Sequence, residues 1–560
     1  MRSFLYSLIF VIASPALGAS YPPTFATGGM VAADNADASR IGAAILEQGG
    51  DAADAAAAVA LYLGVVQPFA SGIGGGGFAV VHRHGAEAYA LDFREMAPGK
   101  AHRDMYLDPE GQVIPQLSTR GPKASGIPGE VAGLYALHQK HGKLPWRAVV
   151  APALAAAQDG FPVGELLHRR ISRYRDRLAE RPRFARQFLT ASGEPLPVGA
   201  SLKRPALAKT LAAIGEAGAE AFYRGPIAQE IARSMAADGG LITITDLAGY
   251  VTKERPLVRD TVMGFDVISM PPPSSGGAVI VAVLKALEGT PLKQEGHNSS
   301  AYLHRLTEAF KHAFADRARV MGDPDFTPVP LDALVGDMAV KRVKAAFDPE
   351  KTLPKDAYGG PFGVPDDGGT SHFSVVDGAG NAVALTTTIN TGFGSLYIAG
   401  ETGIVMNNEM DDFVAKPGVP NVFGLIGQAA NAVAPGKRPL SSMSPTIVLK
   451  EGQVRLVAGA SGGPTIITGT LQVMLNVLVF GMDVRRAIEA PRIHHQWVPE
   501  ILFVEDDIPA DVRAGLERRG HTLKVRPRFN SVQGIEGRKG GWWGASDPSK
   551  LGRPAGVKTP

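Results

Sequence analysis

The stretch Gly368-Gly369-Thr370-Ser371-His372-Phe373 marks a sharp change in the character of the chain. The segment that leads into it, 351–369, holds three prolines and five glycines and is predicted to be an exposed, poorly ordered linker. Strand-like sequence follows directly. A cut after Gly369 would make Thr370 a new N-terminus, whose α-amine could take the proton from its own hydroxyl. Thr370 is therefore a candidate nucleophile that carries its own base.

In two segments after Thr370, the residue types alternate with the two-residue period of β-strands. The segments span 371–377 and 382–389 and are joined by the turn Gly378-Ala379-Gly380-Asn381. Symmetric folding about this turn brings Thr370 opposite Ile389 and beside Thr388 and Asn390, which share one strand face. A bulge or a diagonal contact is needed to bring Thr370 to that face. Taken alone, the pattern also fits an ordinary threonine-rich hairpin.

The spacing of apolar residues predicts helices in the first two thirds of the chain, with one hairpin among them. The expected helices are 34–48, 51–66, 146–158, 205–217, 227–236 and 301–320. The hairpin pairs 78–83 with 88–94 around Gly85. The glycine-rich run 71–77 lacks the Gly-Lys-Ser/Thr of a phosphate-binding loop, so it indicates tight turning or close backbone approach.

The composition is that of an ordinary globular protein, with 45% apolar and 20% charged residues in a chain of 560. The 57 basic and 54 acidic side chains leave a net charge of only +3, so no basic field points to nucleic acid or to an anionic membrane. Small-molecule chemistry is favoured. The chain has no cysteine, which permits an oxidising compartment but supplies no disulfides there.

The N-terminus has the pattern of a secretory signal peptide. Arg2 precedes an apolar run at 4–13, and Ala16-Leu17-Gly18 offers small residues for cleavage. Residues 1–18 are therefore predicted to be removed, which leaves a mature chain that starts near Ala19 and is exported, to the periplasm or outside the cell. The apolar run is too short for the ~20 residues of a membrane span, and no later stretch is long and apolar enough.

Six motifs, in the same order, resemble those of the γ-glutamyltranspeptidases, members of the N-terminal-nucleophile hydrolases. They are Leu91-Asp92-Phe93-Arg94-Glu95-Met96-Ala97-Pro98, Thr370-Ser371-His372-Phe373-Ser374-Val375-Val376-Asp377, Asn407-Asn408-Glu409-Met410-Asp411-Asp412-Phe413, Pro439-Leu440-Ser441-Ser442-Met443-Ser444-Pro445-Thr446, Ser461-Gly462-Gly463 and Gly544-Ala545-Ser546-Asp547-Pro548. They cover essentially the whole mature chain. The resemblance implies an α+β fold, a four-layer αββα sandwich.

The resemblance also implies a precursor that cleaves itself between Gly369 and Thr370. The products would be a large subunit, 19–369, and a small subunit, 370–560, which form a heterodimer and share one fold. Thr370 would be the nucleophile, supported by Thr388, and the backbone N–H groups of Gly462 and Gly463 would form the oxyanion hole. The implied reaction passes a γ-glutamyl group from glutathione or a related compound to water, an amino acid or a peptide.

The remaining matched residues would bind the two charges at the far end of the γ-glutamyl group. Arg94, Ser441 and Ser442 match the positions that hold the α-carboxylate. Asn390, Glu409 and Asp412 match those that hold the α-ammonium. No cofactor and no metal are implied. The pairs His82 with His84 and His494 with His495 lack a third ligand in the sequence and are expected to be surface or partly packed side chains.

A lid-like stretch, 417–424, has Phe423 where many relatives carry tyrosine, so a hydrogen bond that fastens the lid is expected to be lost. The looser lid favours hydrolysis, with transfer as a competing path. Two alternatives stay open: a cephalosporin acylase of the glutaryl type on the same scaffold, and a non-catalytic exported binding protein. Arg94 together with Glu409 and Asp412 argues for an amino-acid head group and against the acylase, whereas a binding protein would keep an intact chain.

Overall fold

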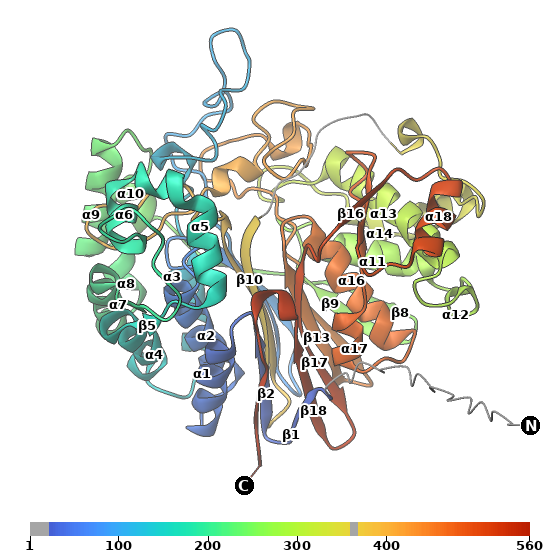
Figure 1. Cartoon of the computed structure of the whole chain (residues 1–560), viewed down its shortest axis with the longest axis horizontal. Helices are drawn as coiled ribbons and strands as arrows, with labels where there is room; N and C mark the ends of the chain where they lie inside the picture. The colour runs from blue at the N-terminus through green and yellow to red at the C-terminus, as the bar shows by residue number, and fades with distance from the viewer. Residues whose placement is uncertain (1–21, 359–367, 560) are drawn as a thin grey trace, which may run out of the picture.

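Two seven-stranded sheets lie face to face at the centre of the molecule, and helices cover their outer faces (Figure 1). The computed structural model describes residues 22–358 and 368–559. The first sheet consists of β1 (Thr24–Ala26), β18 (Gly541–Ser546), β17 (Ser531–Arg538), β13 (Gln453–Ser461), β12 (Thr446–Lys450), β9 (Phe265–Ser269) and β8 (Val258–Val262), in that order. The second consists of β19 (Ala555–Val557), β2 (Gly29–Ala33), β10 (Gly368–Asp377), β11 (Ala382–Thr391), β3 (Gly76–His82), β4 (Tyr89–Phe93) and β7 (Lys253–Arg255). The four-layer αββα sandwich implied by the resemblance is confirmed.

Alternate residues of the second sheet point into two different cores, which is why its strands are buried on both faces. In β2, Val31 and Ala33 pack against the outer helices. Met30 and Ala32 point the other way and join the core that contains the first sheet. Every residue of β2 is buried as a result.

The helices divide between the two outer layers by their position in the chain (Figure 1). The layer on the second sheet holds α1 (Ala36–Glu47), α2 (Ala52–Val66), α3 (Glu130–His141), α4 (Trp146–Asp159), α5 (Glu165–Ala179), α6 (Pro182–Phe188), α7 (Pro205–Ala217), α8 (Ala219–Tyr223), α9 (Pro226–Ala237) and α10 (Ile244–Ala248). The layer on the first sheet holds α11 (Gly276–Leu287), α12 (Leu292–Glu295), α13 (Ser300–Val320), α14 (Leu331–Val335), α15 (Asp337–Ala346), α16 (Thr465–Leu478), α17 (Val484–Glu489) and α18 (Ala510–Arg518). Within the described part of the chain, no helix has the length and apolar character to cross a membrane.

The six helices expected from the sequence are confirmed as α1, α2, α4, α7, α9 and α13, each within two residues of its expected ends. Side chains decide two of the starts: Asn35 caps α1, and Asp51 caps α2 with Asp54 completing the capping box. The hairpin around Gly85 is confirmed as β3 and β4. Smaller strands complete the structure, namely β5 (Phe161–Pro162), β6 (Ser201–Leu202), β14 (Ile493–His494), β15 (Leu502–Glu505) and β16 (Leu523–Arg526).

The hairpin of β10 and β11 contains the bulge that the sequence required. Gly369 pairs with Asn390, and the next residue, Thr370, pairs with Thr388, so the ladder skips Ile389. The bulge lies between Gly369 and Thr370 and turns the Thr370 side chain to the face of Thr388. Both strands lie at the centre of the second sheet, where their backbone is fixed on two sides.

The segment 351–369 is only partly the exposed linker that the sequence predicts. Tyr358 is buried, and its hydroxyl donates to Glu308 on α13. Gly368 and Gly369 belong to β10. The prediction was wrong at Tyr358, whose aromatic ring packs in the core, and at Gly368 and Gly369, which extend the ladder of β10. The predicted signal peptide, 1–18, and the centre of the linker, 359–367, lie outside the described residues.

Candidate active site

Thr370 is buried beside Thr388 at the bulge in β10. The two hydroxyl oxygens lie 3.1 Å apart. Thr388 donates its one hydroxyl proton to the Gly369 carbonyl oxygen at 2.8 Å and accepts a hydrogen bond from the Asn390 N–H at 2.8 Å. Since the Thr388 proton is committed to Gly369, the Thr370 hydroxyl is the donor between the two threonines. The predicted support of Thr370 by Thr388 therefore has a direct geometric basis.

Lys550 binds the backbone of Thr370 from the other side, a contact that the sequence did not indicate. Its ammonium donates to the Thr370 carbonyl oxygen and lies 2.7 Å from a carboxylate oxygen of Asp34. Burial raises the pKa of Asp34, against the attraction of Lys550. Lys550 lies two residues beyond Pro548, the last residue of the C-terminal motif, which was the only sequence signal for it.

Gly462 and Gly463 connect the end of β13 to the start of α16. Both have positive φ, 132° and 58°, which glycine adopts without strain. Among the described residues, neither N–H donates to a protein acceptor. Two backbone donors beside a helix N-terminus suit a developing oxyanion.

The guanidinium of Arg94 lies just after β4 and is fully buried among carboxylates. Its two terminal nitrogens contact Glu409 and Asp412, and Nε donates to the Pro439 carbonyl at 3.3 Å. Burial lowers the pKa of Arg94, but the surrounding carboxylates more than reverse this and raise it. Burial in turn raises the pKa of Glu409 and of Asp412, although Arg94 opposes the rise.

Two further charged groups that the sequence did not single out adjoin this cluster. Glu95 is buried with both carboxyl oxygens lacking a hydrogen-bond partner in the described part of the chain. Its burial raises its pKa to about 7, against the attraction of Arg94. Arg317, on α13, donates to Ser275 at 2.8 Å and reaches the Ser442 hydroxyl at 3.5 Å. Burial lowers the pKa of Arg317 to about 10, against the attraction of Asp412.

One small cavity brings nearly all of the predicted site residues together. Its volume is about 20 Å³, enough for about one water molecule. The predicted residues that line it are Arg94, Thr370, Thr388, Asn390, Glu409, Asp412, Phe423, Ser441, Ser442 and Gly463. Two others do not line it: Gly462 lines a larger neighbouring cavity of about 540 Å³, and Gly369 lines a third, smaller one. Positive and negative groups of the predicted clamp thus pair with one another, and a substrate has to separate them.

Phe423 covers this cavity and is itself buried, with 4% of its surface exposed. Its ring packs on Gly463, where an added Cβ would lie 2.9 Å from the ring. The loop is also held through its backbone: the Phe423 carbonyl accepts from Gln496 at 3.2 Å, and the Val422 N–H donates to Asp411 at 2.9 Å. Packing on Gly463 and these hydrogen bonds thus hold the loop of Phe423 against the cavity without a tyrosine hydroxyl.

The histidine pairs singled out in the sequence are more deeply buried than expected. His82, His494 and His495 are all buried, and His494 forms hydrogen bonds of 2.9 Å with Thr468 and with Gln496. Burial lowers the pKa of His494 to about 4, so its ring is neutral near neutral pH. The expectation of surface or partly packed side chains was wrong for these three residues; His494, for example, lies between Thr468 on α16 and the ring of Phe503 on β15.

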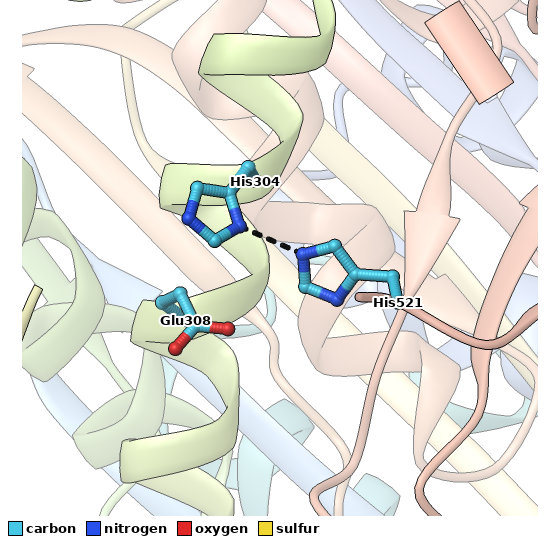
Figure 2. Close-up of side chains that lie close together, drawn as sticks. All are labelled: His304, Glu308 and His521. Atoms are coloured by element: carbon cyan, nitrogen blue, oxygen red, sulfur yellow. Dashed lines mark hydrogen bonds between the residues drawn. The ribbon is translucent and has the colours of Figure 1, made fainter. Parts of the chain in front are cut away.

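A different group of possible metal ligands consists of His304 and Glu308 on α13 and His521 after α18 (Figure 2). Nδ1 of His304 and Nε2 of His521 lie 2.7 Å apart and share a hydrogen bond. Glu308 accepts from Thr352 at 2.6 Å and lies 3.4 Å from the Lys311 ammonium. The two histidines bond to each other, Glu308 has Thr352 and Tyr358 as partners, and a cation lies beside it, so the cluster is a polar connection between α13 and the segment after α18.

Comparisons with known proteins agree with this geometry. The family model described as gamma-glutamyltranspeptidase matches residues 38–557. A glutathione hydrolase proenzyme of Escherichia coli is 44% identical over 533 residues, covering 95% of this chain and 92% of the relative. Glutathione hydrolase 2 of Arabidopsis thaliana is 41% identical and covers 94% and 93%.

Two solved structures are similar in fold. A cephalosporin acylase from Bacillus halodurans has a TM-score of 0.86 at 27% identity and covers 99% of this chain and 100% of the acylase. The γ-glutamyltranspeptidase of Helicobacter pylori has a TM-score of 0.56 at 39% identity and covers 57% of this chain and 91% of its own.

Proposed function

The chain belongs to the γ-glutamyltranspeptidase family and is a γ-glutamyl hydrolase/transferase, and on this premise we propose that it matures by cutting itself before Thr370 and then acts on glutathione. The observation that carries the proposal is the shared cavity, in which Thr370, its partner Thr388 and a complete set of charges for an amino-acid head group meet. The relatives named glutathione hydrolase proenzyme support both parts.

Maturation begins with the Thr370 hydroxyl attacking the Gly369 carbonyl carbon. Thr388 already donates to that carbonyl oxygen and would stabilise the negative charge that forms on it. The C–N bond breaks, the Thr370 nitrogen takes up the proton lost by the hydroxyl, and an ester links Gly369 to Thr370. Water then hydrolyses the ester, which leaves a carboxylate on Gly369 and a free amine on Thr370.

The free amine supplies the base that the uncut chain lacks. It takes the proton of the Thr370 hydroxyl, and the oxygen attacks the γ-carbonyl of the substrate while Gly462 and Gly463 donate to the oxyanion. The proton passes to the leaving nitrogen as the C–N bond breaks. Water or an amine then attacks the ester and restores the Thr370 hydroxyl.

The charged cluster selects the γ-glutamyl group. The substrate α-carboxylate would take the place of Glu409 and Asp412 on Arg94, with Ser441 and Ser442 completing its binding. The α-ammonium would then pair with the two released carboxylates and with Asn390. This exchange of ion pairs would leave every buried charge with a partner of opposite sign. A glutaryl group has no ammonium, so it would leave the released carboxylates without a cation.

Cleavage would divide the sandwich between two chains that stay together. The proposed large subunit, 19–369, supplies α1 to α15, and the small subunit, 370–560, supplies β10 to β13 at the centre. Each sheet contains strands of both, so the subunits would form a tightly joined heterodimer. The signal-like N-terminus supports export to the periplasm or outside the cell.

A denaturing gel of purified wild type beside Thr370→Ala tests the proposal. Two fragments for the wild type, one band for the variant, and release of glutamate from glutathione only by the cleaved form are expected. A single uncut wild-type band together with glutathione turnover would contradict self-cleavage. Turnover of glutaryl amides in place of γ-glutamyl amides would favour the acylase activity of the Bacillus halodurans neighbour.

A further inference from the structure

A second cavity reaches the candidate nucleophile through Lys550, and basic side chains line it. Its volume is about 540 Å³, the size of a site for a small peptide. Six cationic side chains line it: Arg169, Arg170, Arg173, Arg526, Arg528 and Lys550. Among the described residues that line it there is no aspartate or glutamate. The whole chain has a net charge of only +3, so this concentration of positive charge is local.

The basic side chains come from three separate parts of the chain. Arg169, Arg170 and Arg173 lie on α5, Arg526 ends β16, and Lys550 follows the last motif. In Figure 1, α5 and β16 appear on either side of β10, the strand that carries Thr370. The cavity lining confirms that these elements face a common space.

Lys550 and Arg528 pair with carboxylates outside the cavity, and Arg170 and Arg173 have interaction partners of their own. Lys550 pairs with Asp34 at 2.7 Å, and Arg528 lies 3.2 Å from Asp547. Arg526 is placed over the ring of Phe503, 4.4 Å from its centroid, an arrangement that leaves its charge in place. Arg169 is exposed. Within the described part of the chain, Arg169 and Arg526 form no ion pair with a carboxylate, so these two side chains give the cavity a local positive potential that a polyanion would reduce.

The position of the cavity decides which part of a substrate would reach it. The γ-carbonyl bound at Thr370 has two substituents, and the cluster around Arg94 takes the γ-glutamyl head. The other substituent is the leaving amine, or later the acceptor amine. Gly462 and Lys550 line the basic cavity, and Lys550 contacts the Thr370 carbonyl. Arg170 also lines a smaller cavity with Gly369, the residue before the nucleophile.

We propose that the basic cavity is the binding site for the leaving and accepting peptide, and that it selects acidic peptides that carry several carboxylates. The inference rests on the proposed reaction at Thr370 but concerns a different part of the substrate. Electrostatic attraction of this kind speeds association and weakens with salt.

The test compares three donors that differ only in the leaving peptide: γ-Glu-Ala-Glu-Glu, γ-Glu-Ala-Gln-Gln and γ-Glu-Ala-Lys-Lys. For the mature wild type, kcat/KM is expected to be about tenfold higher for the acidic donor than for the neutral one, and lowest for the basic donor. Raising the salt concentration should shrink the difference. Equal kcat/KM for the three donors would overturn the inference.

Matched double variants show whether the cavity causes the preference. Arg169→Gln with Arg526→Gln removes two charges from the cavity, and the ratio of acidic to neutral kcat/KM should fall about threefold. Arg177→Gln with Lys524→Gln removes the same charge from α5 and β16 outside the cavity and should keep the wild-type ratio. An equal fall in both variants would overturn the inference.

Binding separates this inference from the proposed function. The free peptides Ala-Glu-Glu, Ala-Gln-Gln and Ala-Lys-Lys are titrated into the cleaved protein by calorimetry. Tighter binding of the acidic peptide, weakened only by the Arg169 and Arg526 substitutions, supports the basic site even if none of the donors is turned over. Turnover of all three donors at one rate, with no preference in peptide binding, would leave the proposed function standing and contradict the basic site.

Discussion

The hydroxyl oxygen of Thr388 lies 2.8 Å from the carbonyl oxygen of Gly369, at the bond where cleavage is proposed. The same hydroxyl lies 3.1 Å from the Thr370 oxygen. One side chain thus touches both the attacking group and the carbonyl under attack. Under the proposed reaction, this relationship would give Thr388 a part in maturation as well as in the later reaction.

Thr388→Ala should slow self-cleavage by about 10² to 10³, because a donor to the developing oxyanion is lost. A time course of fragment formation on a gel measures the rate. Thr388→Ser keeps the hydroxyl and should retain most of the cleavage rate. Equal rates for the alanine and serine variants would show that the hydroxyl does not act in cleavage.

Gly369→Ala should hinder both the bulge and the cut. An added Cβ would lie 2.5 Å from the Phe69 carbonyl oxygen and 2.6 Å from that of Thr391, and neither backbone atom can move easily. We expect a loss of about 1–3 kcal/mol in stability and slower cleavage. Thermal unfolding and the gel time course measure these effects.

Gly164→Ala is the matched control, since a Cβ there meets no atom within 4 Å. It should leave both the unfolding temperature and the cleavage rate near wild type. A Gly369→Ala protein that cleaves as fast as this control would contradict the steric argument.

Arg94→Lys should weaken substrate binding more than it slows chemistry. Lysine cannot reproduce the two-pronged contact of a guanidinium with a carboxylate, so KM for a γ-glutamyl donor should rise about tenfold or more. Steady-state kinetics on cleaved protein give KM and kcat separately. A cleaved variant with the wild-type KM would contradict the assignment of Arg94 to the substrate carboxylate.

Phe423→Tyr should shift the products from hydrolysis towards transfer. A hydroxyl on the lid could fasten it over Gly463 and keep water out for longer. The share of γ-glutamyl-glycylglycine among the products, with glycylglycine as acceptor, measures the shift. An unchanged share would show that the lid does not control the balance.

Glu95→Gln should make the stability of the protein less sensitive to pH. The folded pKa of Glu95 is raised from 4.5 to about 7, so its contribution to stability is fully present below pH 4.5 and is lost as the pH rises to 7. Glutamine does not ionise, so the free energy of unfolding of the variant should rise relative to that of the wild type by about 3 kcal/mol across that interval. Urea unfolding of both proteins at pH 5 and pH 8 measures the difference, and a gap that does not depend on pH would contradict burial of a protonated Glu95.

Local sequence was sufficient for the parts of the fold whose causes are local. The periodicity of apolar residues located α1, α2 and α13, and the turn at 378–381 located the β10–β11 hairpin. The two-residue period of the strands also showed that Thr370 needed a bulge to reach Thr388. Motif resemblance supplied the site residues, ten of which line one cavity.

Tertiary structure alone decided which distant groups share a space. Lys550 reaches Thr370 across 180 positions of sequence, and Arg169 on α5 faces Arg526 on β16 across one cavity. Neither contact follows from the spacing of residues along the chain, because each depends on how the two sheets and their helices pack. The sequence by itself thus determined the candidate nucleophile and the elements that hold it, whereas the charge around Thr370 was decided only when the layers came together.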